Sequence, residues 1–299
     1  MARGVLLRES VVTHQNGIVG AMKPSTKSSS STAPAPRDDV TSRESDSGNV
    51  AQTDFYVAMP HLLNASLLLE EFPPSLRNAL HFIIGTDMPD GGGGTGEADL
   101  LEPRPQGEDR LTLVLDLDET LVHCRTDMLP DIRHNFCVRF EESQATGWIY
   151  VRPFARLFLE IVSRLFEVVV FTASSRSYAD QVLDTLDPEG KCISRRLYRQ
   201  HCTEVGGGFV KDMSRLGRSL ERVILVDNSP VSLAMCPDNG VLVAGWTAEQ
   251  HNDRELVDLL LLLQQCMQHH SVSDYLSKRY GLRAFLEELR AWPELLGDF

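Results

Sequence analysis

The sequence lacks the cysteine patterns that mark metal-binding and thiol-dependent proteins. Its 299 residues include six cysteines, none of which form a C-x-x-C pair or stand with histidine at zinc-ligand spacing. No cysteine is followed six positions later by arginine, which excludes the C-x-x-x-x-x-R signature of cysteine-dependent phosphatases. Scattered cysteines are typical of reduced thiols, so a cytoplasmic or nuclear location is expected.

Three further features are absent. No G-K-[ST] sequence exists, which excludes a P-loop kinase or GTPase. The longest apolar run, at 259–263, is far shorter than the roughly 18 to 20 residues that span a bilayer. The chain has 29 Lys and Arg against 42 Asp and Glu, a net charge of -13, so direct binding to nucleic acid is not expected.

Composition divides the chain into four parts. Residues 1–54 are poor in large apolar groups and are expected to form a disordered tail, although the few acids in 1–36 are also typical of mitochondrial transit peptides. Residues 55–108 predict one or two short helices, broken at Pro73 and Pro74, and a Gly/Pro linker. The linker's G-x-G-x-x-G pattern, at 91–96, precedes no convincing helix and is discarded as a dinucleotide site. A main domain is expected over 109–268 and a helical extension over 269–299.

Strand and helix patterns alternate from residue 111 onwards. Buried strands are expected at "LTLVL", "EVVVFTA" and "RVILVDNS", with helices between them, including one that starts near Pro153. Such alternation is typical of an α/β fold with a Rossmann-like parallel sheet and helices on both faces. Alternating segments within 125–151 predict a small antiparallel insert.

Each predicted buried strand ends in polar residues. The first ends at Asp116 and Asp118, the second at Thr172 and the third at Asp227 and Asn228. Ligands collect at the carboxyl ends of parallel strands, so these side chains are expected to lie together, with Lys211 brought in by a loop or short helix. Taken singly, each has an ordinary structural explanation, such as a cap, a turn or a surface charge. Their joint position favours a catalytic site.

These residue types suit phosphoryl transfer through a covalent intermediate. Asp116 can attack phosphorus to give an aspartyl-phosphate, and Asp118 can act as general acid and base. Lys211 and Thr172 would bind the phosphate oxygens. Oxygen ligands from Asp116, Asp227, Asn228 and a backbone carbonyl suit Mg²⁺, which would also offset the repulsion between Asp116 and Asp118. With Asp118 included, the predicted metal-site residues are Asp116, Asp118, Asp227 and Asn228.

The segments "LDLDETLVHC", "VVVFTASSRSYAD", "RRLYRQHC", "FVKDMSRLGRSLERVILVDNSP" and "CPDNGVLV" resemble the haloacid dehalogenase superfamily. Within it they are most similar to the FCP/SCP-type phosphatases, which act on the C-terminal domain of RNA polymerase II. The resemblance covers about 109–268 and includes the D-x-D-x-T motif, here Asp116, Asp118 and Thr120. It implies a Mg²⁺-dependent phosphoserine/phosphothreonine phosphatase whose partner is a phosphoprotein or phosphopeptide.

The resemblance also implies roles for individual residues. Arg199 matches a basic residue that contacts substrate phosphate, and Tyr178 matches an aromatic residue that lines the peptide groove. The insert would dock the peptide, with a pocket for a proline side chain formed by Phe136, Val138, Phe140, Trp148 and Ile149. Polar residues at 175–177 depart from the apolar pattern of many small phosphatases, which makes this pocket less apolar.

One other function of the same fold stays open at this point. The mitochondrial presequence translocase contains a subunit of this fold that binds peptides without catalysis. The acid-poor residues 1–36 are compatible with that alternative. A domain that only binds peptides has no need of Thr172, Lys211 and Asp227. Their presence favours the phosphatase hypothesis.

Overall fold

The computed structural model describes residues 74–89, 99–141 and 143–293. All of them belong to one compact unit, 55–299. The predicted tail at 1–54 and the helix expected before Pro73 lie outside the described residues. A helix begins at Pro74, α3 (Pro74–Gly85), in agreement with the expected break at the two prolines.

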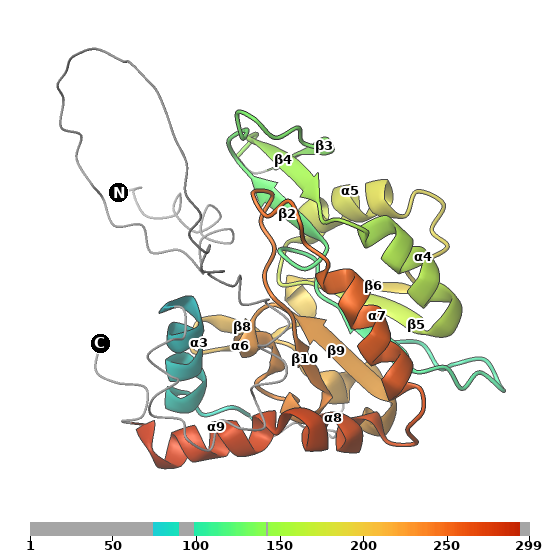
Figure 1. The fold of residues 1–299 in the computed structure, drawn as a ribbon, viewed down its shortest axis with the longest axis vertical. Coiled ribbons are helices and arrows are strands. Elements are labelled where there is room, and N and C mark those ends of the chain that lie inside the picture. Colours follow the sequence, from blue (N-terminus) through green and yellow to red (C-terminus); the bar gives the residue numbers. More distant parts are fainter. Residues whose placement is uncertain (1–73, 90–98, 142, 294–299) are drawn as a thin grey trace, which may run out of the picture. The chain divides into compact units, whose positions relative to one another are not determined.

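The core of the unit is a parallel five-stranded sheet (Figure 1). The predicted α/β fold is confirmed, and the three predicted buried strands are its three central members. The strand order is β10 (Gly240–Leu242), β9 (Val223–Asp227), β1 (Thr112–Leu115), β5 (Glu167–Phe171) and β6 (Arg195–Leu197). In β1, Leu113 pairs with Val168 of β5 and Ile224 of β9. All four residues of β1 are buried because helices cover both faces of the sheet.

Side chains of β1 alternate between two apolar cores. Leu113 and Leu115 lie in the larger core, and Val114 lies in the second core on the other face. Among the described residues, the helices that contribute to the larger core are α4 (Ala155–Leu165), α5 (Arg176–Leu186), α7 (Glu255–Cys266) and α8 (Val272–Tyr280). The second core contains residues of α3, α6 (Pro230–Leu233) and α9 (Leu282–Ala291), which pack together on that face (Figure 1).

The predicted antiparallel insert is a three-stranded sheet with the order β2 (Val122–Arg125), β4 (Thr146–Val151) and β3 (Phe136–Arg139). The five side chains expected to line one pocket do not share a face. Val138 and Ile149 are buried in the larger core, whereas Trp148 packs on the opposite face with Leu129 and Ile132. Neighbouring residues of a strand point to opposite faces, so Trp148 and Ile149 cannot line the same pocket.

Shorter elements connect these strands and helices. A two-stranded hairpin, β7 (Thr203–Val205) and β8 (Gly208–Val210), precedes Lys211. Within the described ranges, 3₁₀ helices fill several connections: η3 (Arg199–His201), η4 (Met213–Leu216), η5 (Leu220–Arg222) and η6 (Pro237–Asn239). Short polar or glycine-containing strands such as β6, β8 and β10 carry little periodic signal, and the sequence did not predict them.

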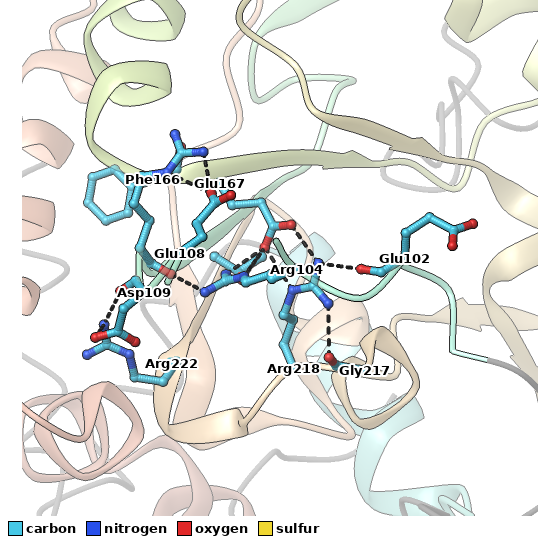
Figure 2. A network of polar contacts seen from close by, with 11 residues as sticks. Glu102, Arg104, Glu108, Asp109, Phe166, Glu167, Gly217, Arg218 and Arg222 are labelled. Carbon is cyan, nitrogen blue, oxygen red and sulfur yellow. Dashed lines mark hydrogen bonds and ion pairs between the residues drawn. The ribbon is translucent and has the colours of Figure 1, made fainter. Parts of the chain in front are cut away.

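The segment before β1 is fixed to the base of the sheet (Figure 2). Glu167, the first residue of β5, accepts hydrogen bonds from Arg104 (2.6 Å) and Arg218 (2.7 Å). Both guanidinium groups hold the pKa of Glu167 down at about 2 against the opposing effect of burial. Nearby, the Leu100 N–H donates to the carbonyl of Arg215 (2.9 Å). These contacts tie residues 100–104 to the end of the sheet opposite the polar strand ends.

The expected helical extension at the end of the chain packs against the main unit. Leu276 and Tyr280 of α8 are buried in the larger core, and Phe285, Leu286 and Leu289 of α9 are buried in the second. All six cysteines are free thiols, as expected. No helix within the described ranges has the length and apolar character to cross a membrane.

Candidate active site

Two carboxylates from neighbouring strands converge on one buried amine. Asp116 directly follows β1, where its N–H donates to the carbonyl of Val226, and Asp227 ends β9. The Lys211 Nζ donates to Asp116 Oδ1 (2.7 Å) and to Asp227 Oδ2 (2.6 Å). Lys211 is only 1% exposed, so the three charges interact in a largely water-free environment.

This buried cluster perturbs the pKa values of its members. Burial and the neighbouring charge of Asp227 raise the pKa of Asp116 to about 7, although Lys211 lowers it. The two carboxylates raise the pKa of Lys211 above its usual range despite burial, so the amine stays protonated. One ammonium between two carboxylates leaves the group with a net negative charge when both acids are ionised. The site therefore favours a further cation.

Asp118 lies two residues beyond Asp116 and has different partners. Its Oδ2 accepts from the Ser174 hydroxyl (2.7 Å), and its Oδ1 accepts from the Tyr178 hydroxyl (2.5 Å). Burial raises the pKa of Asp118, while the hydrogen bonds from Tyr178 and Ser174 lower it. The opposing effects suit a group that exchanges a proton during a reaction. Tyr178 was expected to line a peptide groove, but its hydroxyl is a direct partner of Asp118.

Thr172 directly follows β5 and is 1% exposed. Its hydroxyl accepts a hydrogen bond from the Ser174 N–H (3.0 Å), and its own hydrogen bond to Asp118 lowers the pKa of that acid. Thr172 therefore lies within the same polar group as Asp118. Arg199 approaches this loop from η3, because its Nε donates to the carbonyl of Ala173 (2.7 Å) and its guanidinium lies over the Phe209 ring, 5.3 Å from the centroid.

Asn228 follows Asp227 at the end of β9. Its Nδ2 donates to Glu119 Oε2 (3.1 Å), on the turn that carries Asp118. The Ser229 N–H donates to Asp227 Oδ1 (2.8 Å), which fixes the orientation of that carboxylate. The structure thus gathers all of the predicted catalytic, phosphate-binding and metal residues at one sheet edge, in two groups centred on Asp116 and Asp118.

Sequence reasoning missed the residues that support this edge. Arg152 has a fully buried side chain that pairs with Asp253 (2.7 Å) and donates to the carbonyl of Thr120 (3.2 Å), while its N–H donates to the carbonyl of Leu121. The ion pair therefore anchors the turn after Asp118. Arg152 and Asp253 are 101 positions apart, and neither belongs to a local pattern that could have indicated their pairing.

A model of the family "NLI interacting factor-like phosphatase" matches residues 111–274, more than half of the chain and all of the predicted site residues. The chain belongs to this family. The resemblance to FCP/SCP-type phosphatases is thereby confirmed. Helices α3 and α9, which pack on the second core, lie outside the matched region.

Individual relatives agree with this assignment. The human "Carboxy-terminal domain RNA polymerase II polypeptide A small phosphatase 1" is 44% identical over 168 residues, 56% of this chain and 63% of that protein. A "Probable C-terminal domain small phosphatase" of Dictyostelium discoideum is 44% identical, with 59% of this chain and 58% of that protein covered. "CTD small phosphatase-like protein 2" of the same organism is 39% identical, with 63% of this chain and 33% of that protein covered.

The match spans between 33% and 63% of the length of these three curated relatives. Among solved structures, a fission yeast RNA polymerase II CTD phosphatase Fcp1 bound to beryllium fluoride covers 60% of this chain, and the match covers 56% of Fcp1. Its sequence identity is 20% and its TM-score is 0.38.

Proposed function

We propose that this chain is a phosphoprotein phosphatase that uses Asp116 as its nucleophile. The observation that carries the proposal is the Lys211 amine, held by Asp116 and Asp227 at the same sheet edge as Asp118. A carboxylate beside a fixed positive charge can attack a phosphoryl group while that charge neutralises its oxygens. The family relatives named as phosphatases support the same reaction.

The proposed reaction has two steps. In the first, an Asp116 carboxylate oxygen forms a bond to phosphorus, the bond from phosphorus to the substrate hydroxyl oxygen breaks, and protonated Asp118 gives its proton to that oxygen. In the second, Asp118 takes a proton from water as the water oxygen attacks phosphorus, and the bond between phosphorus and Asp116 breaks to release phosphate. Asp118 ends protonated, as it began, and is ready for the next turnover.

The residues present fit a magnesium ion. Asp116, Asp227 and the neutral Asn228 offer oxygen atoms as metal ligands. The two ionised aspartates carry two negative charges, of which the Lys211 ammonium offsets one. In the described part of the chain no group of three or more His, Cys, Asp or Glu is arranged to hold a metal, so the ion would depend on few protein ligands. Mg²⁺ suits this because it retains several waters. When bound, Mg²⁺ would offset negative charge on the phosphoryl group.

Asp118 was also predicted to take part in metal binding. Its two carboxylate oxygens accept hydrogen bonds from Ser174 and Tyr178. We therefore propose Asp116, Asp227 and Asn228 as the side-chain ligands, and the role of Asp118 in metal binding stays a prediction.

The substrates would be phosphoserine or phosphothreonine peptides, including peptides like the RNA polymerase II C-terminal domain that gives the relatives their names. Lys211 and Thr172 would bind the phosphate, and Arg199 would contact it beside the loop at Ala173. A cytoplasmic or nuclear location remains expected. The phosphatase relatives give no support to the mitochondrial alternative.

The proposal is tested by measuring phosphate release from a phosphopeptide and from a small aryl phosphate, with and without Mg²⁺. We expect Asp116→Asn to lower kcat at least about a thousandfold, because an amide is a far poorer nucleophile. Asp274→Asn is the matched control, since Asp274 is exposed in the first turn of α8 and belongs to none of the predicted site residues. Turnover by Asp116→Asn at the wild-type rate would refute the assignment of Asp116 as the nucleophile. An inactive wild type that binds unphosphorylated peptides would favour the non-catalytic alternative.

A further inference from the structure

Glu119 occupies an unusual backbone position between Asp118 and Thr120. Its φ angle is +62°, in the left-handed region that non-glycine residues seldom adopt. Its N–H donates to the carbonyl of Val122 (2.6 Å), and its carbonyl accepts from the Trp246 N–H (2.8 Å). Such a conformation costs about 1 kcal/mol or more and persists where the surroundings hold it. The contacts on both sides of the Glu119 backbone provide that restraint.

The Glu119 side chain determines which end of the Asn228 amide faces it. A carboxylate has only acceptors, so Asn228 must turn its Nδ2 toward Glu119 Oε2, at 3.1 Å. The oxygen of the same amide then points away from Glu119. A side-chain amide such as glutamine would impose no such choice, because it has both a donor and an acceptor.

Gly245 lies against both members of this pair. A Cβ atom on Gly245 would lie 3.2 Å from Asn228 Nδ2 and 3.4 Å from Glu119 Oε2. The glycine therefore lets the backbone approach both groups closely. Gly245 directly precedes Trp246, whose N–H holds the Glu119 carbonyl, so one short segment confines both partners.

We propose that Glu119 is a positioning residue that makes Asn228 present its oxygen, and not its nitrogen, to the magnesium ion. The inference rests on the proposed function, in which Asn228 is a metal ligand. Glu119 itself would touch neither the substrate nor the metal. Outer partners of this kind typically change metal affinity 10- to 100-fold when they are altered.

The test is a double-mutant cycle with Mg²⁺ affinity as its readout, measured by calorimetric titration of the full chain with Mg²⁺ alone. Glu119→Gln removes the constraint, and we expect it to weaken Mg²⁺ binding about tenfold. Asn228→Asp has an oxygen at both ends of its side chain, so orientation no longer matters. In the Asn228→Asp background, Glu119→Gln should therefore cause no further loss.

Glu249→Gln is the control, because Glu249 is exposed and pairs with Arg125. It should bind Mg²⁺ as the wild type does, and thermal melting of each variant establishes that it is folded. An unchanged affinity in Glu119→Gln, or an equal loss in both backgrounds, would overturn the inference and indicate a role of charge alone. A wild type that binds no Mg²⁺ would overturn it as well. A wild type that binds Mg²⁺ but hydrolyses no phosphopeptide would instead refute the proposed function.

Discussion

At the scale of single residues, the two aspartates of the D-x-D-x-T motif are stabilised in different ways. Asp116 is paired with the Lys211 ammonium, whereas Asp118 is held by the Tyr178 and Ser174 hydroxyls. The sequence could predict that two neighbouring carboxylates need compensation, but it assigned that role to Mg²⁺ and assigned Lys211 to the substrate phosphate. It could not predict the hydroxyl partners, because Tyr178 is 60 positions from Asp118 and tyrosine on a helix is usually a packing residue.

Tyr178→Phe tests the division of roles between the two aspartates. The hydroxyl of Tyr178 lowers the pKa of Asp118 by bonding to its charged form, so its removal should raise that pKa. If Asp118 must be protonated to release the substrate oxygen, the basic limb of the kcat/KM profile should move to higher pH. The acidic limb, assigned to Asp116, should move little.

The measurement is the pH dependence of kcat/KM with the small aryl phosphate, for the wild type and for Tyr178→Phe. Tyr275→Phe serves as control, because Tyr275 donates to Gln265 in the C-terminal helices and not to the site. A basic limb that stays in place, or that moves to lower pH, would contradict the assignment of Asp118 as the acid.

At the scale of elements, the sequence predicted what periodicity and composition determine. The apolar strands β1, β5 and β9 and the helices between them were recognisable, and so was the meeting of their polar ends. The short strands β6, β7, β8 and β10 were not recognisable, since three residues cannot display a period. The hairpin that delivers Lys211 therefore could be predicted only as a loop or short helix.

The ion pair between Arg152 and Asp253 joins elements that are remote in sequence. Arg152 follows β4, and Asp253 precedes α7. We expect Arg152→Met to lower the free energy of unfolding by about 3 kcal/mol, because it leaves Asp253 as an uncompensated charge whose side chain is only 7% exposed. It should also lower kcat, since the carbonyl of Thr120 loses its donor.

Urea denaturation of the wild type and Arg152→Met measures the stability change. Arg156→Met is a suitable comparison, because Arg156 is exposed and donates to the carbonyl of Thr185 in α5 (2.8 Å). If Arg152→Met lowers the free energy of unfolding no more than Arg156→Met does, the buried ion pair contributes no more to stability than a surface contact.

At the scale of the whole unit, residues outside the family domain contribute to its structure. Arg104 precedes the matched region, yet it pairs with Glu167 at the start of β5, and Arg218 reaches the same carboxylate from the loop after η4 (Figure 2). Leu101 is buried in the second core beside residues of α3 and α9. The boundary of the family match at residue 111 therefore does not mark the end of the packed unit.

Glu167 should make the stability of this unit depend on pH. Its pKa is lowered from the ordinary value of 4.5 to about 2, so its contribution is fully present above about 4.5 and is lost as pH falls toward 2. We expect Glu167→Gln to lower the free energy of unfolding by about 2 kcal/mol at pH 7, after allowance for partial solvent exposure. The difference from the wild type should shrink between pH 4.5 and pH 2.

Urea denaturation at pH 7, 4 and 3 measures both effects, with Glu287→Gln on the exposed face of α9 as control. The control should follow the wild type at every pH. If the free energy of unfolding of Glu167→Gln stays below that of the wild type by the same amount from pH 7 to pH 3, the shape of the side chain, and not its charge, holds the two arginines. A deficit that shrinks on acidification would place the electrostatic tie between residues 100–104 and the sheet among the forces that keep this unit folded.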